Sequence, residues 1–137
     1  MKLDNCIFCK IANGEIPSAT LYEDEDFRVI LDLGPASKGH ALILPKEHAA
    51  NIFELPEELA AKAMVVAKKV STVLMEGLKC DGLNIVQNNG EPAGQTVFHF
   101  HMHLIPRFEG DKETVRLNWT PGTLTDEMKE EVLALFK

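Results

Sequence analysis

Three histidines at alternate positions are the residues of this chain best suited to chemistry. His99, His101 and His103 fall on every second residue, which is the period of a β-strand, where alternate side chains share a face. We therefore expect three imidazoles on one face of a strand, neighbours about 6–7 Å apart. The apolar residues between and beside them would lie on the core: Phe98, Phe100, Met102 and Leu104.

Imidazole is the side chain whose ordinary pKa, about 6.5, lies closest to neutrality. Its neutral form offers a lone pair to phosphorus, to a proton or to a metal. The chain has five histidines and three of them lie in this stretch, which argues against an accidental group on a solvated face. The spacing therefore predicts a nucleophilic site or a metal site.

The surrounding stretch, 94–107, resembles the signature of the histidine triad (HIT) family, His-x-His-x-His followed by apolar residues. The match includes Gly-Gln-Thr-Val at 94–97 and Pro-Arg at 106–107, and the resemblance extends from about Cys6 to Trp119. Cys-x-Phe-Cys-Lys-Ile at 6–11 and Glu-Ile-Pro at 15–17 favour the bacterial Hint-like branch of nucleotide phosphoramidases and hydrolases. The resemblance implies a purine nucleotide-binding hydrolase or transferase that cleaves at the α-phosphorus of a nucleoside 5′-phosphoramidate.

The same resemblance implies the catalytic roles. His101 would be the nucleophile, because a neutral histidine can hold the transferred group covalently as a nucleotidyl-histidine and divide one hard step into two. His103 would hydrogen-bond the phosphate or the leaving group. His40 corresponds to an upstream histidine close to the triad, and Thr96 stands where the family often has Ser or Thr near the scissile bond.

The nucleoside half of the site is implied in the same way. Asp32 matches a residue that accepts both ribose hydroxyls, a task suited to the two oxygens of a carboxylate. Asn88 and Gln95 would supply further polar contacts, with ordinary loop hydrogen bonds as the alternative for them and for Thr96. The residues that sandwich the purine in the family, for which core packing is the alternative, correspond to Phe8, Ile16 and Leu33.

Cys6-x-x-Cys9 alone is compatible with redox activity or with coincidence, but with two histidines it gives the Cys₂His₂ set that tetrahedral zinc favours. Related bacterial triad proteins bind zinc through such a Cys pair, the histidine after Pro-Lys-x and the first triad histidine. These positions are Cys6, Cys9, His48 and His99. Four protein ligands would close the coordination shell, so Zn²⁺ would be structural. Cys80 lies outside this set, and we expect it to be a buried thiol.

Length and charge limit the classes of protein. With 137 residues and 45% hydrophobic content, we expect one domain over 1–137, with a core at about 6–119 and an extension over 123–137. The net charge of −7 argues against a nucleic-acid-binding surface. We expect a cytoplasmic protein, because the N-terminus lacks the apolar core of a signal peptide and no apolar run could span a membrane.

The elements that would position these residues are predicted from periodicity and turn residues. We expect an α+β, HIT-like fold, with an antiparallel sheet of about five strands, one long helix and short helices at both ends. The long helix would begin with Pro56 in its first turn, and its apolar stripe would be Leu59, Ala63, Val66, Val70 and Val73. The predicted ranges are helices 6–13, 56–78 and 125–137, strands 20–23, 27–32, 40–45 and 83–88, and the triad strand.

Trp119-Thr-Pro-Gly122 resembles the end of the compact family members, whose tail reaches the active site of the partner in a dimer. We therefore expect a homodimer, although residues 123–137 have no counterpart in those compact members. Two other functions stay open. One is a dinucleoside polyphosphate hydrolase, and the other is a nucleotide- or zinc-binding regulatory protein with little turnover.

Overall fold

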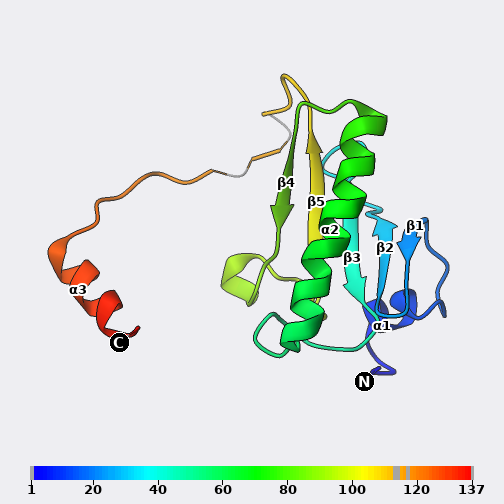
Figure 1. The fold of residues 1–137 in the computed structure, drawn as a ribbon, viewed down its shortest axis with the longest axis horizontal. Helices are drawn as coiled ribbons and strands as arrows, with labels where there is room; N and C mark the ends of the chain where they lie inside the picture. The colour runs from blue at the N-terminus through cyan, green and yellow to red at the C-terminus, as the bar shows by residue number, and fades with distance from the viewer. Residues whose placement is uncertain (1, 113–114, 117, 137) are drawn as a thin grey trace.

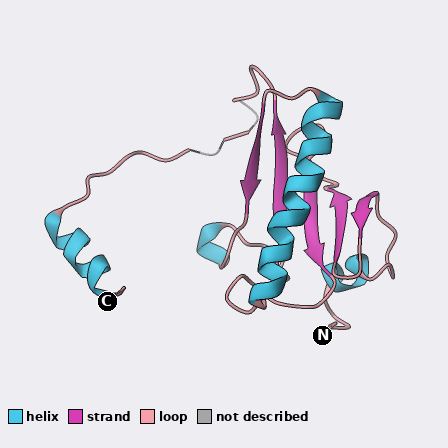
Figure 2. Ribbon diagram, viewed as in Figure 1, coloured by secondary structure: helices cyan, strands magenta, loops and turns pink. Residues whose placement is uncertain are grey.

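A five-stranded antiparallel sheet is the centre of the fold in the computed structural model, which describes residues 2–112, 115–116 and 118–136. The strand order is β1-β2-β3-β5-β4, and each neighbouring pair is antiparallel (Figures 1 and 2). The predicted α+β class is confirmed. The strands are β1 Thr20–Glu23, β2 Phe27–Leu31, β3 Ala41–Pro45, β4 Gly82–Val86 and β5 Met102–Arg107.

Helices occupy both faces of the sheet and the C-terminal end of the chain. The long helix α2, Glu57–Leu78, lies across one face, and the short α1, Ile7–Ala12, lies against the other (Figure 1). A short 3₁₀ helix η1 spans Glu91–Ala93, and α3 spans Asp126–Ala134. Pro56 occupies the N-cap position of α2, so the helix begins at Glu57, one residue later than predicted.

The main core lies between α2 and the sheet. Phe100, Met102 and Leu104 point into it, as the alternation predicted, and Leu59 and Val66 meet them from α2. The predicted helix stripe is wrong at one position, because the side chain of Val73 is 67% exposed. At that turn Leu74 makes the core contact instead, and Val73 borders a groove beside β1.

The histidines occupy the opposite face of the sheet. His103 pairs with Leu42 across β3 and β5, and Leu42 belongs to a smaller apolar cluster that packs against α1. The predicted triad strand is too long, since β5 begins only at Met102. The amide of Phe100 donates to the carbonyl of Ala49, in the loop after β3, at 2.7 Å. It is therefore not used in pairing with a neighbouring strand.

Phe98 was predicted on the core and is 51% exposed, because the apolar face begins only at Phe100. Thr125 caps α3, its hydroxyl accepting from the amide of Met128 at 3.2 Å. Cys80 is buried, as expected. No helix among the described residues has both the length and the apolar character needed to cross a membrane.

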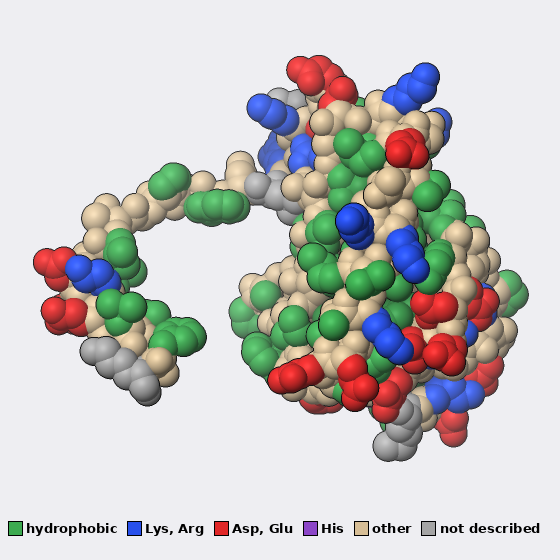
Figure 3. All heavy atoms as spheres, in the orientation of Figure 1, with side chains coloured by type: hydrophobic (Ala, Val, Ile, Leu, Met, Phe, Trp, Pro, Cys, Tyr) green, Lys and Arg blue, Asp and Glu red, His purple; other side chains and the backbone are tan. Residues whose placement is uncertain are grey.

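The C-terminal segment leaves the sheet beyond the β4 edge and carries α3 away from it (Figure 1). No residue of α3 is buried. On the face shown in Figure 3, Lys and Arg side chains follow α2 with apolar side chains between them.

Candidate functional site

Three imidazoles meet on the α1 side of the sheet. His40 lies directly before β3, His101 lies directly before β5, and His103 is the second residue of β5. The ring centroids of His101 and His103 are 5.1 Å apart, as are those of His40 and His103. The Phe8 ring, from α1, packs edge-on against His101, with the ring centroids 5.0 Å apart.

His101 has the tautomer of a nucleophile. Its Nδ1 lies 2.8 Å from the carbonyl oxygen of His99. A carbonyl can only accept, so Nδ1 carries the proton and Nε2 keeps its lone pair. Burial lowers the pKa of His101, which keeps the ring neutral at pH 7.

His40 fixes the opposite tautomer on His103, with the proton on Nε2. The amide of Ala36 donates to His40 Nδ1 at 2.9 Å, so Nε2 of His40 carries its proton. That nitrogen lies 2.9 Å from His103 Nδ1 and donates to it. His103 therefore carries its own proton on Nε2, where it can donate to a ligand.

Burial keeps the other two rings neutral as well. Burial, together with the neighbouring His101 and His40, lowers the pKa of His103 to about 4. It also lowers the pKa of His40, against the opposing effect of the Asp32 carboxylate. A lone pair and an N–H donor thus lie side by side, as needed to attack phosphorus and bind its oxygens.

A pocket lies in front of the histidines. Six residues predicted from the sequence line it: Phe8, Asp32, Leu33, Thr96, His101 and His103. Its other lining residues are Ile7, Ile11, Ile30, Leu31, Leu42 and Val97. The pocket is therefore an apolar slot with a carboxylate and two imidazoles at its edge. The sequence gave no sign that Ile7 and Ile11 of the first helix border a ligand site.

The remaining predicted residues lie outside that lining. The side chain of Gln95 is buried, accepting from the amide of Gly90 at 2.8 Å and donating to the carbonyl of Ala50 at 2.7 Å. Its contacts hold the loop that precedes the histidines. Asn88 lies beside Gly94 in that loop, and Ile16 is half-buried after α1.

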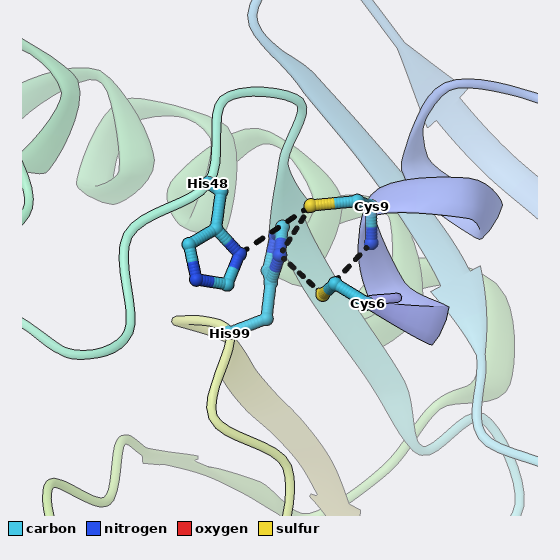
Figure 4. A group of neighbouring side chains, drawn as sticks. All are labelled: Cys6, Cys9, His48 and His99. Carbon is cyan, nitrogen blue, oxygen red and sulfur yellow. Dashed lines mark hydrogen bonds between the residues drawn. The ribbon is translucent and has the colours of Figure 1, made fainter. Parts of the chain in front are cut away.

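Four potential metal ligands converge beside this pocket. Cys6 and Cys9 come from the start of α1, His48 from the loop after β3, and His99 from the approach to β5 (Figure 4). Their donor atoms all lie within 4.8 Å of one another. The structure thus brings together all four residues of the predicted set.

Their separations fit tetrahedral zinc. His99 Nδ1 lies 3.3 Å from Cys6 Sγ and 3.4 Å from Cys9 Sγ, and His48 Nδ1 lies 3.4 Å from Cys9 Sγ. Zinc bonds of about 2.3 Å to sulfur and about 2.0–2.1 Å to nitrogen place such atoms about 3.5 Å apart. His99 Nε2 donates to the carbonyl of Pro45 at 2.8 Å, which leaves Nδ1 free to ligate.

The charge state of His99 also fits a metal ligand. Burial lowers the pKa of His99 to about 4, so its ring is neutral at pH 7. Burial raises the pKa of the Cys9 thiol, and a cation would reverse this by stabilising the thiolate. The set can therefore hold one zinc ion and leave His101 and His103 to the pocket.

The sequence profile of the HIT domain matches residues 13–110. The chain belongs to the HIT family. A HIT-like protein of Methanocaldococcus jannaschii is 46% identical over 127 residues, covering 93% of this chain and 98% of that protein. The adenosine 5′-monophosphoramidase of Saccharomyces cerevisiae is 43% identical over 121 residues, covering 88% of this chain and 73% of the yeast protein.

Solved HIT structures share the fold. A HIT family protein of Bacillus anthracis superposes with a TM-score of 0.89 at 39% identity, covering 97% of this chain and 95% of that one. Coverage this high includes the C-terminal segment. A zinc-bound histidine triad protein of Mycobacterium smegmatis superposes with a TM-score of 0.75 at 37% identity, covering 96% of this chain and 95% of that one.

Proposed function

We propose that this HIT protein hydrolyses purine nucleoside 5′-phosphoramidates at the α-phosphorus through a nucleotidyl-His101 intermediate. The observation that carries the proposal is the pair of tautomers: His101 presents a lone pair on Nε2, and the neighbouring His103 presents an N–H. The name of the yeast relative, an adenosine 5′-monophosphoramidase, supports the substrate class.

In the first step, Nε2 of His101 attacks the α-phosphorus and the P–N bond breaks. The departing nitrogen takes up a proton from solvent, while the N–H of His103 holds a phosphate oxygen or the leaving group. In the second step, water attacks the phosphorus and gives up one proton to solvent, the bond to Nε2 breaks and the nucleoside monophosphate departs. His101 is then neutral again, with its Nδ1 proton still bonded to the carbonyl of His99.

The nucleoside would occupy the apolar slot beside the histidines. Phe8 and Leu33 would contact the purine, because both line the pocket and Leu33 is 99% exposed. One Asp32 oxygen already accepts from the amide of Gly34 at 2.9 Å, which orients the carboxylate for the ribose hydroxyls. Thr96 would approach the scissile bond from the pocket edge. Ile16, Asn88 and Gln95 would act through the loops that they hold.

Zinc would be structural, bound by the Cys₂His₂ set beside the pocket. The zinc-bound Mycobacterium smegmatis relative supports this assignment. The ion would tie α1 to His99, and so fix the carbonyl that orients His101. We also propose a cytoplasmic location, where paired thiols stay reduced, and a homodimer in which the two sheets join.

Adenosine 5′-phosphoramidate and a diadenosine polyphosphate, assayed side by side, test the substrate class. We expect AMP release mainly from the phosphoramidate; a preference for the polyphosphate would favour the dinucleoside polyphosphate hydrolase. Binding of AMP without turnover of either substrate, unchanged in His101→Ala, would favour the regulatory protein.

A further inference from the structure

Helix α3 carries an apolar stripe that is left uncovered by the residues of this chain that the structure describes. Met128, Val132 and Leu135 recur at helical spacing and are all more than half exposed. Acidic residues occupy much of the remaining surface: Asp126, Glu127, Glu130 and Glu131. In Figure 3 the apolar side of α3 faces the hollow between the tail and the sheet, and the acids face away.

A helix of this length needs a partner. Isolated helices shorter than about 12–15 residues are marginal in water, and α3 has 9 residues. The superposition on the Bacillus anthracis relative includes this segment, so the outlying tail is shared with a solved structure. The partner that stabilises α3 must therefore come from outside the chain's own sheet.

An apolar groove beside α2 has the complementary character. It lies between α2 and β1 and is lined by Leu21, Tyr22, Lys69, Val70, Val73 and Leu74. Val73 is the stripe residue that the core leaves exposed. Lys69 borders this groove, and Lys68 lies with it in the adjoining surface hollow. These cations suit the acids that flank the stripe of α3.

The position of the tail selects the occupant. Among the described residues, β4 is an edge strand that pairs with β5 alone, and the tail passes beyond this edge, away from β1 (Figure 1). A second copy joined at the β4 edge through a two-fold axis would have its groove beyond β4, on the side where α3 lies. We propose that α3 packs into the α2–β1 groove of a second copy of this chain, so that two subunits exchange their C-terminal helices. This inference rests on the proposed homodimer but not on the nucleotide chemistry.

Amide hydrogen exchange of α3 tests the proposal in the full-length protein. We expect exchange at least about tenfold slower than for an unprotected helix. Val132→Asp places a charge on the apolar stripe and should remove this protection. Ala134→Asp adds the same charge outside the stripe and should keep it.

The groove is tested from its own side. Val73→Asp, on exposed α2 surface, should release α3 from protection, whereas Ala61→Asp, on α2 outside the groove, should not. Co-expression of Val73→Asp with Val132→Asp then identifies the chain that is bound. In a mixed dimer, the intact α3 of the Val73→Asp chain meets the intact groove of the Val132→Asp chain. Protection should therefore return to α3 of the Val73→Asp chain.

Three results would overturn the proposal. The first is rapid exchange of α3 in the wild type, and the second is unchanged protection in Val73→Asp. The third is failure of the co-expressed pair to restore protection, which would mean that α3 binds its own chain. AMP release, followed in parallel, reports on the proposed function and has no bearing on these outcomes.

Discussion

At the scale of single residues, one hydrogen bond per ring decides what each histidine can do. His99 gives its Nε2 proton to the carbonyl of Pro45 and so turns Nδ1 toward two sulfurs. His101 gives its Nδ1 proton to the carbonyl of His99 and so turns Nε2 toward the pocket. His99 is thus suited to bind a metal through Nδ1 and His101 to attack through Nε2, because the other nitrogen of each ring donates to a carbonyl.

The lowered pKa of His101 predicts the pH dependence of kcat/KM. The active form is neutral, and burial moves the folded-state pKa below 6.5, so kcat/KM should change little as pH falls from 8 to about 7 and should have its acid midpoint below 6.5. The rate should then decline on the acid side of that range. A pH profile with its acid midpoint at or above the ordinary pKa of histidine would contradict this assignment.

The histidines could be predicted from the sequence, whereas most of the pocket could not. The spacing of His101 and His103 places both on one face, but it does not say which element covers that face. Ile7 and Leu42 line the pocket because α1 folds back over β3, a contact between distant parts of the chain. Gln95 has the chemistry of a ligand contact, but its bonds to Gly90 and Ala50 depend on loop geometry.

At the scale of elements, zinc would connect three segments that lie far apart in the sequence. The ligands come from α1, the loop after β3 and the approach to β5. We predict that Cys6→Ser loses zinc and unfolds at lower temperature but keeps some turnover, because His101 and His103 do not bind the ion. Elemental analysis should give one zinc per wild-type chain.

Cys80→Ser is the matched control, since Cys80 lies away from the cluster, with its Sγ 3.0 Å from Met75 Sδ. It should keep zinc. Metal-free wild-type protein whose stability does not change in chelator would rule out a structural ion.

We expect substitution by alanine to have opposite effects on the unfolding free energy at two glycines. Gly39 has φ +89°, and an added Cβ would lie 2.5 Å from Leu78 Cδ1. Gly39→Ala should therefore cost about 1–3 kcal/mol of unfolding free energy. Gly77 lies within α2, and an added Cβ there would meet no neighbouring atom of the described residues within 4 Å, so Gly77→Ala should stabilise by about 0.5–1 kcal/mol. Urea unfolding of both variants would show the difference, and equal effects would contradict it.

The ends of the elements show where local patterns stop being informative. The alternation around the triad correctly places Phe100 and Met102 in the core. It does not place the start of β5, because Phe100 bonds to the loop at Ala49. Periodicity likewise assigned Val73 to the core, but at that turn Leu74 packs on the core and Val73 faces the groove beside β1.

At the scale of the whole molecule, the free edge of β4 and the outlying α3 both predict a second copy. Light scattering should therefore give twice the chain mass of 15.2 kDa. A monomer at micromolar concentration would contradict the homodimer and, with it, the exchange of helices. The single tryptophan, Trp119, lies in the same segment and is 83% exposed, so its fluorescence would report on dimer formation.

The central claim is covalent catalysis at His101, and intact-protein mass spectrometry tests it most directly. Wild type and His101→Gly would be mixed briefly with adenosine 5′-phosphoramidate and quenched. We predict a nucleotidyl adduct on the wild type alone, and loss of at least about 10³-fold in turnover for the variant. Neither an adduct nor released AMP from the wild type, or equal AMP release by His101→Gly, would contradict the claim.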